Sequence, residues 1–427
     1  MIKNPSKLTL NRVSSDILTI LNEGLESSIP AAHLKNYILK NKIQLPSSQI
    51  DLKKYDRVFL VAIGKSAGLM AEYVSKKIKF KNGIVVVPNG IKPKLKKSIY
   101  EIINSGHPIP NQNSFKAGKN LVSFLNETNK NDFVLFLISG GGSALSVYPD
   151  SISLQDKMTV NKILIRSGAN INEIACIRKH LSLIKGGRLI QNMNSTGISL
   201  LISDVIGDDI GSISSGITFY DKSSFSDAAQ IIKKFSLEHK FPKSVLSVLK
   251  SGLDGRILET PKKSLIKNII ILNNFTCLTK MKNKSKKLGY KTHVISNITG
   301  NLDQVTKIIT STAVNSKSDC IIFGGEPTVN VTGNGKGGRN QELVLRLYEK
   351  LKHQKYNFTI ASIGTDGIDG NTKFAGSVFS TVNNYHGLKY IKNNDSSSFF
   401  KKFGGLIKTG ITQNNVNDIG VILRHTL

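Results

Sequence analysis

Apolar residues along the chain follow two different rhythms. In residues 9–42 they recur at helix spacing, which predicts helical structure. The apolar face of this expected helix consists of Leu10, Val13, Ile17, Ile20 and Leu21. From Arg57 onwards, short apolar runs alternate with glycine-rich turns and amphipathic stretches, which is typical of strands alternating with helices.

The alternating part of the chain predicts two α/β domains. Strands are expected at 58–63, 83–87, 133–138 and 198–203, and helices at 66–80, 113–127, 154–167 and 171–185. This order favours a mostly parallel, doubly wound sheet. A basic, proline-containing connection at 254–266 follows, so we expect domains at 1–255 and 256–427. In the second domain we expect strands at 268–272, 293–296, 320–323 and 358–363, and helices at 275–288, 301–316 and 339–351.

Composition agrees with a soluble two-domain protein. A chain of 427 residues exceeds the usual size of one domain. No apolar run approaches the roughly 20 residues of a membrane helix, and no secretory signal opens the chain. The three cysteines are far apart and form no CxxC pair, which disfavours a disulfide framework or a zinc site. We therefore expect a cytoplasmic protein without a membrane partner.

The net charge of +30 suggests nucleic acid as a partner, but its distribution does not. The 59 basic residues are 50 Lys and nine Arg, spread along the chain beside Asn and Ser. There is no basic tail and no aromatic interleaving. A lysine-rich solvated surface explains the charge better than a nucleic-acid interface, so we expect no nucleic-acid partner.

Two glycine loops follow predicted strands of the first domain. Ser139, Gly140, Gly141, Gly142 and Ser143 come directly after the strongest strand signal. Backbone N–H groups at such a strand end can bind an anion, although a plain glycine turn has the same composition. Lys65 follows another strand in Ile63–Gly68, which lacks the spacing of a P-loop and of a GxGxxG motif. A cation at the start of a helix is favourable when an anion is bound there. An ordinary surface lysine is an equally good interpretation of Lys65.

Charged residues cluster at two further places in this domain. Lys179 and His180 lie in an amphipathic segment, 172–188, whose cations crowd together and favour an anion. His180 could act as a base, although a histidine on a helix is more often structural. Asp204 follows a strand with two more carboxylates close by, which suits Mg²⁺. Capping of the next turn is the alternative role for Asp204.

Three segments of the second domain contain residues suited to phosphate chemistry. Glu326 ends a predicted strand, and Gly337, Gly338, Arg339 and Asn340 open a helix. In a chain so poor in arginine, the planar guanidinium of Arg339 is informative, because it can bind phosphate or carboxylate through two parallel bonds. In a third segment, Asp366 and Asp369 follow a strand in a loop too poor in acids to be an EF-hand.

Together these motifs are typical of phosphoryl transfer, in which positioning and charge neutralisation dominate catalysis. Ordered along the chain, they resemble the glycerate 2-kinase family, whose C-terminal portion is called the MOFRL domain (about 316–421 here) and whose members often carry the label hydroxypyruvate reductase. The resemblance runs from about residue 10 to the C-terminus. The matching segments are AIGKSAG (62–68), NSGHPIPNQNS (104–114), FLISGGGSAL (136–145), IRKHLSLIKGGRL (177–189), LLISDVIGDD (200–209), SSGIT (214–218), GGEPTV (324–329), GKGGRNQEL (335–343), SIGTDGIDG (362–370) and TGITQNNVND (409–418).

The resemblance implies a Rossmann-like N-terminal domain, a smaller α/β domain and an active-site cleft between them. It implies phosphorylation of the 2-hydroxyl of D-glycerate with ATP and Mg²⁺ as cofactors, by a monomer or homodimer. The family's catalytic lysine and arginine map to Lys65 and Arg339. Lys373 stands where the family pattern has an acid, which removes one metal ligand or substrate contact beside Asp366 and Asp369.

The expected mechanism follows from these assignments. Phosphates and substrate would lie against residues 139–143, with Lys179, His180, Glu326 and the 337–340 segment as further contacts, and Asp204, Asp366 and Asp369 near the metal. His180, Asp204 and an unaided hydroxyl are the alternatives for the base. The alternative function, an NAD(P)H-dependent hydroxypyruvate reductase, requires a dinucleotide fingerprint that the sequence lacks.

Overall fold

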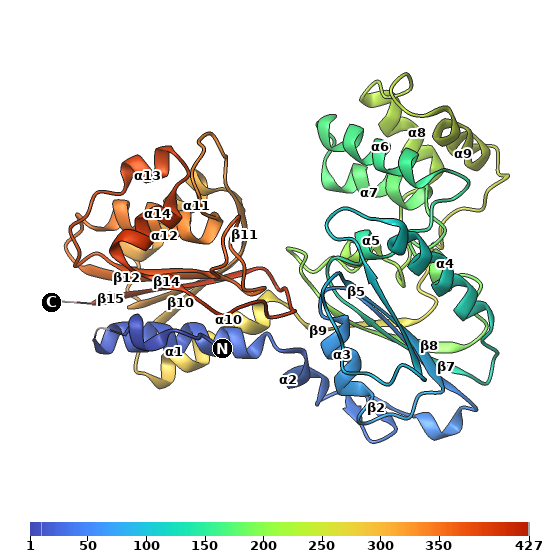
Figure 1. Cartoon of the computed structure of the whole chain (residues 1–427), viewed down its shortest axis with the longest axis horizontal. Helices are drawn as coiled ribbons and strands as arrows, with labels where there is room; N and C mark the ends of the chain where they lie inside the picture. Colours follow the sequence, from blue (N-terminus) through green and yellow to red (C-terminus); the bar gives the residue numbers. More distant parts are fainter. Residues whose placement is uncertain (10, 426–427) are drawn as a thin grey trace. The chain divides into compact units, whose positions relative to one another are not determined.

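The structure is a computed structural model that describes residues 1–9 and 11–425. The chain forms two compact units (Figure 1). The Rossmann-like unit contains His33–Ser203 and Asp208–Ile271, and the C-terminal unit contains Met1–Ala32, Asp204–Gly207 and the chain from Leu272 onwards. These units divide the chain differently from the predicted domains, 1–255 and 256–427, because the first helix packs with the C-terminal strands and helices.

The core of the Rossmann-like unit is a six-stranded sheet in the order β6-β5-β4-β7-β8-β9. The strands are β4 (Val58–Ile63), β5 (Asn82–Pro88), β6 (Tyr100–Ser105), β7 (Phe133–Ile138), β8 (Thr196–Ile202) and β9 (Lys267–Leu272). The registered pairs from β6 to β8 are all parallel. Chain order therefore reverses between β4 and β7, as in a doubly wound nucleotide-binding sheet. The expected fold class is confirmed, and β4 and β7 have the predicted bounds.

Helices of this unit flank the sheet and form a separate group beside it. The helices are α2 (Pro30–Leu34, whose last two residues belong here), α3 (Ala67–Val74), α4 (Gln112–Asn126), α5 (Gly142–Leu145), α6 (Leu154–Arg166), α7 (Ile171–His180), α8 (Phe225–Lys234) and α9 (Lys243–Leu253). Helices α6 to α9 share one hydrophobic core and gather at one end of the unit (Figure 1). Helix α7 ends five residues before the predicted 185, because Ser182 pairs with Pro149 and the Leu183 N–H donates to Tyr148 O (2.8 Å) instead of continuing the helix.

The helical structure predicted over 9–42 is confirmed for Arg12–Ser27 and Pro30–Leu34 but wrong after Leu34. Helix α1 (Arg12–Ser27) buries the predicted Ile17, Ile20 and Leu21, and Val13 is half-buried, whereas Leu10 lies outside the described residues. A second helix, α2, begins at Pro30, and proline disfavours helical backbone in the residue before it. A small antiparallel sheet then forms from β1 (Ile38–Leu39), β2 (Lys42–Gln44) and β3 (Gln49–Asp51). Apolar residues of this segment that fit the spacing of a helix therefore lie in strands instead.

The C-terminal unit is a mixed six-stranded sheet in the order β10-β11-β15-β12-β13-β14. The strands are β10 (Thr292–Asn301), β11 (Cys320–Thr328), β12 (Asn357–Gly364), β13 (Gly376–Ser380), β14 (Leu406–Ile407) and β15 (Asp418–His425). Helices α1 and α10 (Asn274–Lys287) cover one face, and α11 (Leu302–Asn315), α12 (Arg339–Leu351), α13 (Leu388–Lys392) and α14 (Ser396–Phe403) cover the other (Figure 1).

Close packing holds α1 onto the C-terminal unit. A Cβ atom added at Gly24 would lie 2.6 Å from Met281 Sδ of α10 and 2.8 Å from Ile419 Cδ1 of β15. Glycine at this position therefore permits a close approach of α1 to α10 and β15 that any other residue would prevent. Within the described residues, no helix is both long and apolar enough to cross a membrane.

Candidate functional site

The two glycine loops of the Rossmann-like unit are joined at the point where the strand order reverses. The N–H of Lys65 donates to Gly140 O (2.9 Å), and the N–H of Ser66 donates to Ser139 Oγ (3.0 Å). Gly64 has φ +130, and a Cβ there would lie 2.2 Å from Ser139 Oγ. Ligands of doubly wound sheets bind at this carboxyl edge. The structure therefore brings the predicted Lys65 and 139–143 segments together, and Ser139 joins the loops.

A third loop, which contains Ser214 and Ser215, forms hydrogen bonds with the 139–143 loop. Ser214 donates to Ser139 O (2.7 Å), and Ser143 Oγ lies 2.6 Å from Ser215 Oγ. Ser214 and Ser215 have φ of 50° and 61°, values that non-glycine residues rarely adopt and that concentrate at functional sites. A Cβ at Gly142 would lie 2.3 Å from Ser214 Oγ, so glycine is needed for this contact.

His107 lies against the glycine loop beside Lys65. A Cβ at Gly141 would be 3.1 Å from His107 Nε2 and 3.2 Å from Lys65 Cγ. Burial, together with the charge of Lys65, lowers the pKa of His107. The imidazole is therefore neutral at pH 7 and able to accept a proton.

A small cavity of about 220 Å³ opens beside this loop and is lined with cations. Its lining residues are His107, Pro108, Pro110, Gly141, Ser143, Ala144, Lys157, Asn161, Arg178 and Lys185. Lys185 donates to Ser143 O (3.0 Å) and Ser215 Oγ (3.3 Å), and Arg178 Nε donates to Asn161 Oδ1 (2.7 Å). Among the described residues, none that lines this cavity carries a carboxylate.

Two predicted ligand contacts of the same segment have protein partners instead. Lys179 forms a buried ion pair with Asp221 (3.2 Å). The His180 ring is fully buried, with Nδ1 2.8 Å from Cys176 O and Nε2 3.2 Å from Glu259 Oε2. Both side chains therefore hold the α7 region in place, and neither is among the residues that line the small cavity.

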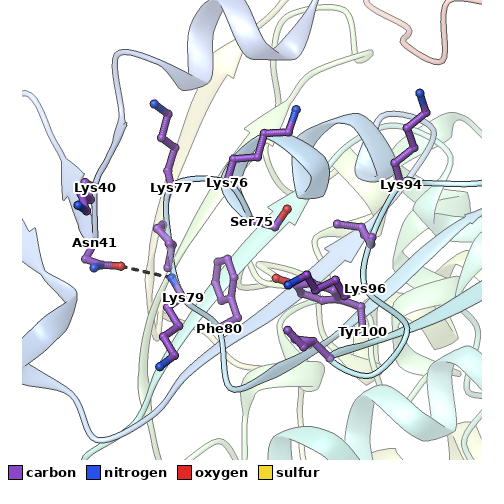
Figure 2. Close-up of a pocket in the computed structure, with 13 residues that line it drawn as sticks. Lys40, Asn41, Ser75, Lys76, Lys77, Lys79, Phe80, Lys94, Lys96 and Tyr100 are labelled. Carbon is purple, nitrogen blue, oxygen red and sulfur yellow. Dashed lines mark hydrogen bonds between the residues drawn. The ribbon is translucent and has the colours of Figure 1, made fainter.

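A larger cavity of about 720 Å³ lies elsewhere on this unit (Figure 2). Phe80 and Tyr100, among its lining residues, lie at the amino ends of β5 and β6. Lys76, Lys77 and Lys94 extend in the same direction, away from these two rings (Figure 2). Ligands of doubly wound sheets bind at the opposite edge, so these lysines are best explained as a solvated surface.

Arg339 opens α12 in the C-terminal unit and binds two carboxylates. Its Nε and Nη2 donate to the two oxygens of Asp418 (2.6 and 3.1 Å), and Nη1 donates to Glu326 Oε1 (2.9 Å). Burial raises the pKa of Asp418 to about 6, even with the guanidinium beside it. These three bonds leave two of the five guanidinium N–H groups for a ligand.

The neighbouring predicted residues shape the start of α12. Asp369 is buried and accepts hydrogen bonds from the backbone N–H groups of Asn340 (3.0 Å) and Gln341 (2.9 Å), so it acts as a helix cap. Gly338 allows this contact, because a Cβ there would lie 2.4 Å from Asp369 Oδ1. Gly337 likewise packs against Ser396.

The carboxylates suit a Mg²⁺ ion that arrives with nucleotide phosphates. Among the residues the structure describes, no three His, Cys, Asp or Glu side chains group as metal ligands. Asp366 is half-buried and accepts one bond, from the Ile368 N–H (3.1 Å), and Asp204 is half-buried at the end of β8. Mg²⁺ commonly takes only one or two carboxylates and completes its shell with phosphate and water. Asp204 and Asp366 fit that role, whereas Asp369 is committed to α12.

His107, Asp418 and Lys157 are among the residues of these sites that were not predicted from the sequence. His107 and Asp418 lie in two of the matching segments, NSGHPIPNQNS and TGITQNNVND, so a signal for them was present. Lys157 lies in none of the matching segments. Only the packing of α6 against α7 reveals that it lines the same cavity as Arg178.

Comparison with known proteins places the chain among characterised sequences. A family described as a domain of unknown function, DUF4147, matches residues 16–250, and the MOFRL family matches residues 319–418, within the predicted 316–421. The glycerate 2-kinase of Pyrococcus horikoshii is 33% identical over 95% of this chain and 96% of its own. The D-glycerate 2-kinase of Thermotoga maritima is 36% identical over 86% of this chain and 91% of its own. The crystal structure of a glycerate kinase from T. maritima matches with a TM-score of 0.83 at 33% identity, covering 96% of this chain and 98% of that one.

Proposed function

The chain belongs to the glycerate 2-kinase family, and we propose that it transfers the γ-phosphoryl group of ATP to the 2-hydroxyl of D-glycerate, giving 2-phosphoglycerate. The observation that supports this most is the cation-lined cavity beside the paired glycine loops. A phosphorylated nucleotide and a hydroxy acid are both anions, and phosphoryl transfer depends on holding and neutralising such groups.

In this proposal the residues of the Rossmann-like unit hold the substrates and move a proton. The ammonium of Lys65 neutralises the transferring group, and the loop at 139–143 positions it. His107 replaces His180 as the candidate base, because His180 is fully buried and both of its ring nitrogens have partners. Neutral His107 would take the proton of the substrate hydroxyl as the new O–P bond forms.

The C-terminal unit contributes Arg339 in the proposal. Its two remaining N–H groups would stabilise charge that develops on the phosphoryl oxygens, while Asp418 and Glu326 fix the guanidinium plane. Asp204 and Asp366 would hold Mg²⁺ together with the nucleotide phosphates, and the ion supplies charge neutralisation when it is bound.

Phosphorus NMR tests the reaction directly. We expect D-glycerate, ATP and Mg²⁺ to give a phosphomonoester resonance coupled to the C2 proton of glycerate. A product phosphorylated at the 3-hydroxyl would contradict the regiochemistry, and absence of any phosphoglycerate would contradict the function. Oxidation of NADH with hydroxypyruvate, followed at 340 nm, would instead support the reductase alternative.

A double-mutant cycle tests whether Lys65 and Arg339 act on the same phosphoryl group. We expect Lys65→Met and Arg339→Met each to lower kcat strongly, and the double variant to lose much less than the product of the two losses, since residues that act as a unit are not additive. Multiplicative losses would show that the two residues act independently.

A further inference from the structure

The three cations of the small cavity come from different segments and face no carboxylate within it. Lys157 is contributed by α6, Arg178 by α7 and Lys185 by the turn after α7. Lys157 and Lys185 are only 8% and 2% exposed. Among the described residues, Lys157 forms no ion pair, and Lys179, a further cation that acts on Lys185, is paired with Asp221.

Such a cluster is unfavourable in the empty protein. Burial and the charge of Arg178 lower the pKa of Lys157 to about 8. Burial, with the charges of Lys157, Arg178 and Lys179, lowers the pKa of Lys185 well below its ordinary value. Packed like charges are relieved by a bound anion, so the cavity favours a negatively charged ligand.

We propose that Lys157, Arg178 and Lys185 form the subsite that binds the carboxylate of the hydroxy-acid substrate. This assignment rests on the proposed kinase function. It replaces the expectation that Lys179 makes this contact, since Lys179 is paired with Asp221.

Cavity size and side-chain geometry favour a carboxylate over a nucleotide phosphate. A volume of about 220 Å³ is below the roughly 300–1,000 Å³ of sites for larger ligands, so it suits a three-carbon acid. The bond from Arg178 Nε to Asn161 fixes the guanidinium plane, and its terminal nitrogens can bind both carboxylate oxygens. His107 and Gly141 line the same cavity, so an acid held there has its hydroxyl end near His107.

Lys157→Met tests the subsite, with Lys162→Met as the matched control. Lys162 lies on the same helix but is exposed. Loss of one charge-assisted hydrogen bond should raise the KM for D-glycerate about 10- to 100-fold. We expect the KM for ATP to be unchanged and Lys162→Met to behave as wild type. The preference for D-glycerate over its neutral amide should fall by the same factor. Circular dichroism melting shows whether each variant is folded.

Calorimetric titration of D-glycerate without nucleotide separates this proposal from the kinase proposal. Weaker binding in Lys157→Met supports the subsite even if no phosphoglycerate is ever formed, an outcome that would contradict only the kinase function. Unchanged D-glycerate binding in folded Lys157→Met overturns the subsite. A rise in the KM for ATP alone also overturns it, because the cavity would then bind phosphate.

Discussion

Replacing Lys157 by methionine should stabilise the unliganded protein at neutral pH. Lys157 is only 8% exposed, lies near Arg178 and has no carboxylate partner in the part of the chain that the structure describes. Methionine fills a similar volume without a charge. The usual effect of removing a buried polar residue, which is destabilisation, is therefore reversed at this position.

The magnitude follows from the lowered pKa of Lys157. The drop from 10.5 to about 8 corresponds to a free-energy cost of about 3 kcal/mol for keeping the folded protein charged there, at about 1.4 kcal/mol per pH unit. Below pH 8 both folded and unfolded chains carry the proton, so the full cost is present. Between about 8 and 10.5 the folded protein has released a proton that the unfolded chain still binds, so stability rises with pH. We expect a gain of about 1–3 kcal/mol at pH 7 that disappears towards pH 10.5.

Urea unfolding followed by circular dichroism measures this gain, because the chain contains no tryptophan for fluorescence. The exposed control, Lys162→Met, should stay within about 0.5 kcal/mol of wild type. Added D-glycerate should stabilise wild type more than Lys157→Met. A Lys157→Met protein less stable than wild type at pH 7 would refute the premise that the charge is unfavourably buried.

Three further predictions follow from the sites. Arg339→Lys should lower kcat by about 10²–10³, because lysine cannot form both bonds to Asp418 and still stabilise phosphoryl charge; unchanged turnover in a steady-state ATP assay would remove Arg339 from the mechanism. His107→Asn should lower kcat by about 10²–10⁴ and abolish an acidic limb of the pH–rate profile that lies below pH 6.5; a surviving limb would exclude His107 as the base. Gly142→Ala should destabilise the protein by about 1–3 kcal/mol in urea, and Ser214→Gly should restore the loss if the clash with Ser214 is its cause.

Local hydrophobic patterns were enough to predict individual strands of the fold. The runs at 58–63 and 133–138 are continuous apolar segments bounded by turns, and they form strands with those bounds. The part of the 9–42 segment after Leu34 was mispredicted because alternation and helix spacing overlap in a short apolar sequence. The antiparallel position of β15 depends on pairing with β11 and β12, which no local pattern encodes.

The sequence predicted those parts of the candidate site that lie in a recognisable motif. It did not predict the parts that depend on how distant segments pack together. The glycine loops and Arg339 were found from their positions after strands and before a helix. Charge crowding in 172–188 favoured a bound anion, which stays a prediction, but the sequence could not tell that Asp221, 42 residues after Lys179, forms an ion pair with that lysine. Nor could it tell that α6 supplies Lys157. Whether a cation is available to bind a ligand therefore depends on partners that are distant along the chain.

The packing of α1 onto β15 and α10 affects how the protein can be synthesised. Met281 and Ile419, against which Gly24 packs, come after α1 in the chain and are therefore made after it. Until then the apolar face of α1 has no docking surface. A fragment starting at Leu272 would expose the same surface and should aggregate, whereas a circular permutant that joins residues 1–32 after the C-terminus should keep this unit intact.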